Sequence, residues 1–266
     1  MAGGRGGRAR PPLHRPGRSE IPGVRRVPWL LIGAVVVILS LIGVIAYNLA
    51  PRVTERIDAQ RFAPSTENPD PSSTIEGVVE AEYAAGNHIG APQRVAYDQS
   101  PPIGGAHDQY WATCTGIVYR TPVRTENIVH SLEHGAVWIA YNPDRVATDD
   151  VTALAAKTDG KPYMLMSPYP GLDSAVSLQS WGHQLKLDNP GDERVSQFIS
   201  ALRQNPNTHP EVGATCATMP GAFDPANPPP FDPSAPGPDA VPAAGPPDSS
   251  QQGSPMLPAT TGGADG

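Results

Sequence analysis

The sequence predicts an α+β domain with a small, mostly antiparallel sheet and two helices, preceded by one N-terminal transmembrane helix. Three observations predict this class: a charge-free apolar run near the N-terminus, short β-rich segments in the middle of the chain, and two later segments with helical spacing. Of the 266 residues, 33 are proline and 27 are glycine, and they crowd the two ends. The foldable part is therefore one domain of modest size.

The charge-free run covers residues 27–51. A helix from Trp29 to Ala50 that rises about 1.5 Å per residue spans roughly 33 Å, which is enough to cross a bilayer core. Seven arginines and one glutamate precede the run. The positive-inside rule therefore places residues 1–26 in the cytoplasm, as a disordered basic tail, and the rest of the chain outside it.

A cleaved signal peptide is the alternative explanation of the same run. Val44 and Ala46 satisfy the small-residue rule for a cleavage site. The apolar region is long for a signal peptide, which favours a single-pass anchor in the cell membrane.

Composition indicates where the linker, the extracytoplasmic domain and the C-terminal tail begin and end. Residues 52–73 end in a Pro, Ser and Asn linker, and an extracytoplasmic domain is expected over residues 74–219. Residues 220–266 are Pro-rich and lack apolar periodicity, so we expect a disordered tail that could reach envelope protein partners. The chain after the apolar run carries 12 basic and 25 acidic residues. Nucleic-acid binding needs a basic face, so this acidic balance argues against it.

Within the domain, strands and helices are both predicted. The segments "GIVYR", "AVWIAY", "PYMLMS" and "SAVSLQSW" are β-rich or partly alternating, and they indicate strands. One helix is expected in "ATDDVTALAAKTDG", with Thr148 or Asp149 as its cap and Gly160 as its end. A second is expected in "NPGDERVSQFISALRQN", where Pro190 stands at the start. Its apolar positions have helical spacing and indicate core packing: Val195, Phe198, Ile199 and Leu202.

Histidines are the residues that point to chemistry. His130 and His134 in "HSLEH" lie on one face of a helical turn, close enough for two imidazole nitrogens to hold one transition-metal ion. His107 follows the glycine pair in "PPIGGAH", and His88 lies in "AGNHIG" as an optional fourth ligand. These residues predict a copper or zinc site. A polar turn whose imidazoles bond to backbone carbonyls stays open as the alternative.

The same "HSLEH" segment matches H-x-x-E-H, a metalloprotease motif in which the glutamate activates zinc-bound water. Those enzymes take a third ligand from a glutamate far downstream on a long helix. Here Gly135 and a strand follow at once, so a metal-dependent hydrolase is disfavoured and no catalytic residue is assigned. Glu133 is instead expected to orient an imidazole without binding the ion. The sequence also lacks a phosphate-binding glycine loop, a G-x-S-x-G elbow and a C-x-x-C motif.

The only cysteines are Cys114 and Cys216. Outside the cytoplasm they are expected to form a disulfide. The alternative makes Cys114 a copper ligand near His107, assisted by Met164 and Met166 on one face of a strand.

The chain resembles an uncharacterised family, domain of unknown function 3105, which occurs in extracytoplasmic bacterial proteins. The resemblance runs from about Ile75 to Leu202 and depends on "VAYDQSPPIGGAH", "YWATCTGIVY", "VHSLEHGAVWIAYNP", "YMLMSPYPGL" and "SWG". The residues at its pattern positions are His88, His107, His130, Glu133, His134, Gly135 and Trp181. "PPIGG" and "CTG" depart mildly from the family pattern. The resemblance implies a single membrane anchor and an exported domain, and it implies no established reaction.

Two functions follow from these observations. The first is a membrane-anchored domain of unknown activity that binds copper or zinc through its histidines. The second is a metal-free envelope interaction module with structural histidines. They differ in whether the imidazole nitrogens converge in space.

Overall fold

The computed structural model describes residues 28–244 together with Gly3. The basic tail expected over residues 1–26 therefore lies, apart from Gly3, outside the described residues, as do residues 245–266 of the expected C-terminal tail. The chain divides into two compact units, residues 1–50 and residues 51–266. Each is described by itself.

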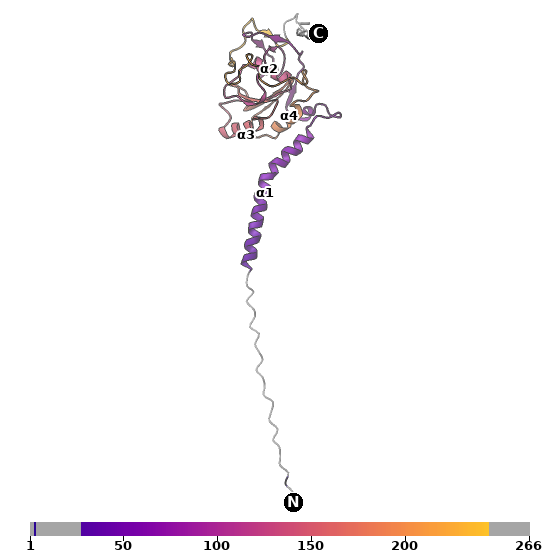
Figure 1. Ribbon diagram of the computed structural model, residues 1–266, viewed down its shortest axis with the longest axis vertical. Helices are drawn as coiled ribbons and strands as arrows, with labels where there is room; N and C mark the ends of the chain where they lie inside the picture. Colours follow the sequence, from indigo (N-terminus) through magenta and orange to yellow (C-terminus); the bar gives the residue numbers. More distant parts are fainter. Residues whose placement is uncertain (1–2, 4–27, 245–266) are drawn as a thin grey trace, which may run out of the picture. The chain divides into compact units, whose positions relative to one another are not determined.

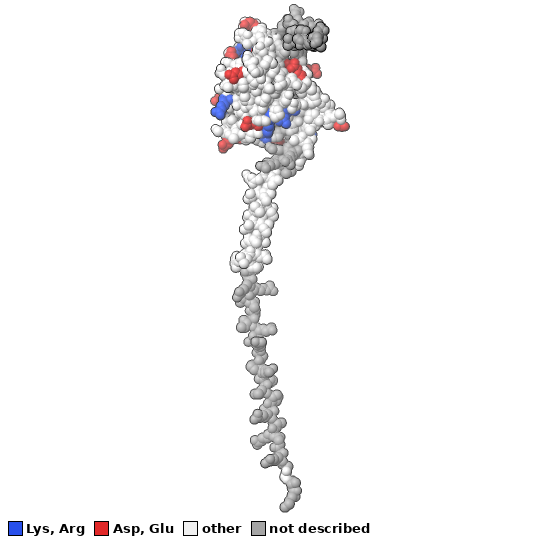
Figure 2. Space-filling model, viewed as in Figure 1, with Lys and Arg blue, Asp and Glu red and all other residues white. Residues whose placement is uncertain are grey.

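The N-terminal unit contains most of helix α1, Trp29–Arg61. Its stretch Trp29–Ala50 has 22 residues and a mean hydropathy of 2.8, with its side chains facing outward rather than into a protein core. On the face in Figure 2 this stretch carries no Lys, Arg, Asp or Glu. Such a helix is long and apolar enough to cross a membrane, as a permanent anchor or as a signal sequence.

The second unit is built on a six-stranded mixed sheet in the order β1-β9-β8-β6-β7-β5. The strands are β1 Val78–Glu80, β5 Thr115–Val118, β6 Val137–Tyr141, β7 Met164–Pro168, β8 Val176–Ser180 and β9 His183–Leu187. Strand β7 runs parallel to β5 and β6, and the other pairs are antiparallel. The expected α+β class, with a mostly antiparallel sheet, is confirmed.

Both faces of this sheet are covered, and the alternation of side chains along its strands divides the core in two. Met164 and Met166 of β7 point into one apolar cluster, whereas Leu165 points into the other. Trp138 of β6 lies in the same cluster as Leu165. Burial on both faces explains why "AVWIAY" and "PYMLMS" read as continuous apolar runs.

Helices α3, Thr148–Thr158, and α4, Arg194–Leu202, were both expected and lie on the face with the two methionines. Phe198 of α4 is fully buried there, as its helical spacing predicted. A third helix, α2, Thr125–Glu133, packs on the opposite face and contains "HSLE". The domain thus has one helix more than the two expected. Figure 1 shows α2 on one side of the sheet and α3 and α4 on the other.

Short elements complete the domain. A 3-10 helix covers Pro71–Thr74, and two small parallel ladders pair β2, His88–Ile89, with β4, His107–Asp108, and β3, Val95–Ala96, with β10, Val241–Pro242.

The segment that was expected to be disordered from residue 220 onward contributes β10 to this unit. It also places Phe223, 4% exposed, in the cluster with Trp138. The described part of the tail therefore packs against the domain.

Candidate metal centre

Two short strands place the first pair of histidines side by side. In the parallel ladder of β2 and β4, His88 is directly opposite His107. Their ring centroids are 4.9 Å apart. His107 is completely buried, whereas His88 is exposed. Strand pairing thus brings together His88 and His107, which are 19 positions apart, and no local sequence pattern predicts that pairing.

Helix α2 supplies the remaining groups. His130, Glu133 and His134 are spaced so that they share one face of the helix. The helix ends at Glu133, and His134 is its C-cap. Gly135 then turns the chain with φ 88°, and a Cβ on it would come within 2.7 Å of the His209 ring. Glycine is therefore required at this position, where the sequence predicted the end of the turn.

Four side chains converge between the ladder and α2. His88, His107, His130 and Glu133 each offer one ligand atom, and these atoms all lie within 4.8 Å of one another. The His130 ring centroid is 4.9 Å from that of His88 and 4.8 Å from that of His107. Such a set could hold a metal ion, since one ion with bonds of about 2 Å joins ligands at these separations.

Backbone carbonyls set the orientation of the buried rings. Nδ1 of His107 lies 2.7 Å from the carbonyl oxygen of Gly105, and Nδ1 of His130 lies 2.7 Å from that of Asp108. A carbonyl oxygen only accepts, so each Nδ1 carries the proton and donates it. In the neutral form of each ring Nε2 is then left with a lone pair, which is the arrangement usual for metal-binding histidines.

Glu133 is held by two contacts. Its Oε1 accepts the backbone N–H of Gly86 at 2.7 Å, and its Oε2 lies 2.8 Å from Nε2 of His107. That last pair is close enough for a hydrogen bond but is not aligned for one, so both atoms are buried without a hydrogen-bond partner among the described residues. Two unpaired buried atoms that face each other are costly unless a third group joins them.

Burial favours the neutral form of His130 and His88. It lowers the pKa of His130 to about 3, and the neighbouring imidazoles of His107 and His134 act in the same direction. Burial and the neighbouring His107 also lower the pKa of His88. Burial alone would raise the pKa of Glu133, but the close contact with His107 and the hydrogen bond from the Gly86 N–H outweigh it and the pKa is lowered. Neutral rings at His88 and His130 beside an ionised Glu133 carboxylate are protonation states that bind a cation.

His134 falls outside this set and belongs to a neighbouring one. Its Nδ1 lies 2.8 Å from the carbonyl oxygen of Thr215, and its Nε2 lies 3.1 Å from Oε2 of Glu211. His130, His134 and Glu211 form a second group whose ligand atoms lie within 4.8 Å of one another. The structure thus separates the expected ligands His107 and His134 into two groups that share His130.

A third group lies apart from these histidines. Asp70, Glu80 and His183 also offer ligand atoms within 4.8 Å. Nε2 of His183 is 3.1 Å from Oδ2 of Asp70, while its Nδ1 faces the carbonyl oxygen of Trp181 at 2.6 Å. Burial lowers the pKa of His183, but the hydrogen bonds to Asp70 and Trp181 outweigh it and the pKa is raised. An imidazolium–carboxylate ion pair accounts for this contact.

Two tryptophans shield the imidazoles. The Trp111 ring centroid lies 5.5 Å from that of His130 and 4.8 Å from that of His134. Trp181 meets His107 edge-on at 6.0 Å. An apolar shell of this kind limits water around the rings and strengthens electrostatic interactions within it.

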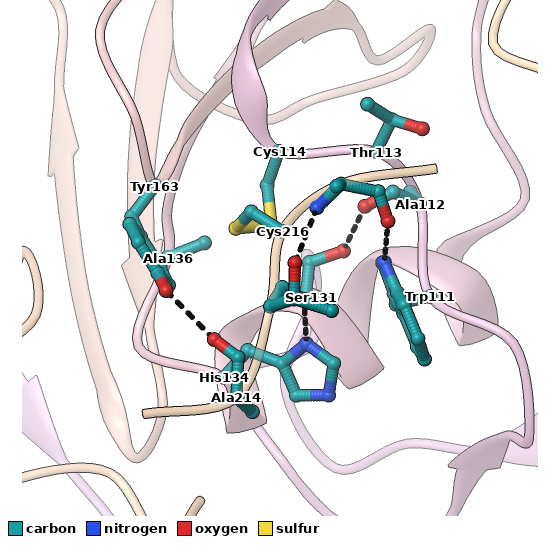
Figure 3. The surroundings of a disulfide bond; sticks show 12 residues. Trp111, Ala112, Thr113, Cys114, Ser131, His134, Ala136, Tyr163, Ala214 and Cys216 are labelled. Atoms are coloured by element: carbon teal, nitrogen blue, oxygen red, sulfur yellow. Dashed lines mark hydrogen bonds between the residues drawn. A yellow bond between two sulfur atoms is a disulfide. The ribbon is translucent and has the colours of Figure 1, made fainter. Parts of the chain in front are cut away.

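The expected disulfide between Cys114 and Cys216 is present. Figure 3 shows that the segment around Cys216 is also held by three side chains of the domain. The Tyr163 hydroxyl donates to the Ala214 carbonyl, Trp111 Nε1 donates to the Ala217 carbonyl, and His134 Nδ1 donates to the Thr215 carbonyl. The disulfide therefore fixes the segment that contains Glu211 beside α2.

The alternative copper site is wrong. Cys114 is bonded to Cys216 and offers no thiolate. Met164 and Met166 are fully buried in the apolar cluster on the opposite face of the sheet from α2. They share one strand face, as predicted, and that face is core.

Glu211 and Gly86 also contribute to these groups, and neither was predicted from the sequence. Glu211 lies 77 residues after His134 in a turn-rich segment without periodicity. Only its closeness in sequence to Cys216 could have signalled that the disulfide brings it to α2. Gly86 acts through its backbone N–H, which no side-chain pattern reveals.

A family model described as a protein of unknown function (DUF3105) matches residues 88–218, which confirms the resemblance seen in the sequence. Searches of curated proteins and of solved structures found no match. The matched region begins at His88 and includes every residue of the two adjoining groups.

Proposed function

The chain belongs to the DUF3105 family, whose function is unknown, through residues 88–218, and from the geometry of the histidine site we propose that the domain binds one divalent copper or zinc ion. The proposed ligands are Nε2 of His107, Nε2 of His130, one ring nitrogen of His88 and the carboxylate of Glu133.

One observation carries the proposal. His107 Nε2 and Glu133 Oε2 are buried, 2.8 Å apart and without aligned hydrogen bonds, inside a set of four convergent ligand atoms. A cation between these atoms satisfies both, whereas an empty interior leaves two polar atoms desolvated. The role of Glu133 in this proposal is that of a ligand, in contrast to the orienting role expected from the sequence.

The ligand types narrow the choice of ion. Three imidazoles and one carboxylate suit Zn²⁺ and Cu²⁺, whereas Cu⁺ favours the soft sulfur of cysteine and methionine. The two cysteines are bonded to each other, and Met164 and Met166 point into the other core cluster. The set therefore favours the divalent ions over Cu⁺.

The position of Glu133 also bears on the hydrolase alternative. A general base must reach a water molecule at the metal and must be able to accept its proton. Here one oxygen of Glu133 accepts the Gly86 N–H and the other faces His107, and the side chain is fully buried. This arrangement supports ion binding rather than water activation by Glu133.

We propose further that α1 is a single-pass anchor with residues 1–26 in the cytoplasm and the metal-binding domain outside it. The disulfide supports an oxidising compartment, and the arginines before Val27 support the orientation. A reporter that is active only outside the cytoplasm should be active when fused after residue 244. Activity of a cytoplasmic reporter at that junction would reverse the orientation.

The experiment for metal binding uses the full-length protein purified in detergent and loaded with Zn²⁺ or Cu²⁺ under competition with a chelator. Elemental analysis should find about one ion per chain at low excess of metal. His107→Ala and His130→Ala should each remove most of the affinity, whereas His209→Ala is a matched control because His209 lies outside the three groups. Equal retention in all variants would leave the histidines structural and favour the metal-free interaction module.

A further inference from the structure

His130 belongs to two sets of ligand atoms, and this sharing is the basis of the inference. It belongs both to the group with His88, His107 and Glu133 and to the group with His134 and Glu211. Its Nδ1 lies 2.7 Å from the Asp108 carbonyl oxygen, so Nε2 is the one nitrogen that His130 can offer to a metal ion. One lone pair binds one ion at a time.

The second group has the features of a prepared site. His134 is 3% exposed, its Nδ1 proton is directed to the Thr215 carbonyl, and its Nε2 faces the Glu211 carboxylate. The Glu211 side chain is 40% exposed, so the group reaches the surface. The Glu211 backbone N–H donates to the Glu133 carbonyl at 3.2 Å, which ties the segment to the end of α2.

We propose that His130, His134 and Glu211 form a second position for a divalent transition-metal ion, next to the first, with His130 as a ligand that changes partner. This inference rests on the proposed function. A single ion takes the four-ligand set. When a second ion enters, His130 joins His134 and Glu211, and the first ion keeps His88, His107 and Glu133.

Electrostatic repulsion makes the affinities for the first and the second ion different. Two divalent cations at neighbouring positions repel each other, and a largely buried setting screens that repulsion poorly. Glu133 and Glu211 offset part of the charge, one at each position. The first ion also loses a ligand when His130 moves. The second ion therefore binds more weakly than the first, and its arrival loosens the first.

The test is a titration of the full-length protein in detergent with Co²⁺, followed by its visible absorption, which reports the number and geometry of ligands. The wild-type protein should show two phases, and the spectrum of the first ion should change during the second phase. Glu211→Gln should lose the second phase and keep the first with an unchanged spectrum. His134→Gln should behave in the same way. Glu76→Gln, at an exposed glutamate outside all three groups, is the matched control and should titrate as wild type.

The outcomes separate this inference from the proposed function. A wild-type protein that takes up one ion and no more, or a Glu211→Gln variant that still shows both phases, overturns the second position and leaves the first intact. Loss of both phases in a folded Glu211→Gln variant would make Glu211 a ligand of the first ion and overturn the two-position arrangement. Failure of the wild type to bind Co²⁺ or Zn²⁺ at all would overturn both proposals.

Discussion

Nε2 of His107 and Oε2 of Glu133 lie 2.8 Å apart, and both side chains are fully buried. His107 comes from strand β4 and Glu133 from the last turn of α2. The contact therefore joins β4 to α2, two of the three elements that contain the candidate metal ligands. Glu133 also supplies the negative charge in the group formed with His88, His107 and His130.

Glu133→Gln tests that charge. Glutamine keeps the size of the side chain but removes the carboxylate, so we expect the affinity for Zn²⁺ to fall by at least about tenfold, in the range seen when groups around a metal site are altered. Competition with a chromophoric chelator measures the change, and Glu76→Gln is the control. Wild-type affinity in Glu133→Gln would remove Glu133 from the ligand set.

Replacing both cysteines by alanine should lower the free energy of unfolding by about 2 to 5 kcal/mol, because the disulfide closes a loop of 102 residues. Urea denaturation measures the loss. In addition, freeing the segment that contains Glu211 should weaken the second Co²⁺ phase more than the first. An unchanged free energy of unfolding would mean that the hydrogen bonds from Trp111, Tyr163 and His134 hold the segment without the disulfide.

The ion pair of His183 and Asp70 predicts a pH dependence of stability. Burial opposes the charge on both groups, but their mutual contact raises the pKa of His183 and lowers the pKa of Asp70. The charge of Glu80 acts in the same direction on His183. The histidine contribution is complete below its ordinary pKa of 6.5 and is lost as pH rises through the higher folded value. The aspartate contribution is present above 3.8 and is lost as pH falls through the lower folded value.

The pair should therefore stabilise the fold most between these two ordinary values, by about 1 kcal/mol or less because solvent screens the partly exposed Asp70. Chemical denaturation at several pH values measures the effect. Asp70→Asn should flatten this part of the profile, whereas Asp144→Asn, at an exposed aspartate, should not. A profile that is the same in Asp70→Asn and wild type would show that other groups set the dependence.

The packing of Phe223 tests the boundary of the domain. Its ring meets Tyr119 edge-on at 6.3 Å and is 4% exposed, so Phe223→Ala should cost about 3 kcal/mol of unfolding free energy. Phe231→Ala is a useful comparison and should cost less, because that ring is only partly buried and lies 4.7 Å from the Tyr169 ring. Truncation after residue 219 should destabilise the domain, whereas truncation after residue 244 should have less effect. Equal stability of both truncated proteins and wild type would restore the boundary expected from composition.

The sequence predicted those elements whose apolar residues recur at regular spacing along the chain. Apolar spacing identified α4, where Phe198 is buried, and the alternation in "YMLM" predicted that Met164 and Met166 share a strand face. Helix α2 was missed because it has only nine residues and is followed at once by Gly135 and a strand. Composition also suggested disorder around Phe223, since a single buried aromatic ring in a proline-rich segment leaves no periodic signal.

The site was partly predictable for the same reason. His130 and His134 are close in sequence, so their shared helix face was visible, whereas the direct pairing of His88 with His107 depends on strand register. Assigning His134 to a different group from His107 required the positions of Thr215 and Glu211. Those positions follow from tertiary contacts and the disulfide, which one sequence does not specify.

Metal-edge X-ray absorption on the full-length protein, loaded with less than one equivalent of Zn²⁺, tests the central claim most directly. We expect a first coordination sphere of nitrogen and oxygen at about 2.0 to 2.1 Å, with the outer-shell pattern of three imidazoles and no sulfur. His130→Ala should reduce the imidazole count by one. A sphere of oxygen alone, or a spectrum identical in His130→Ala and wild type, would contradict it.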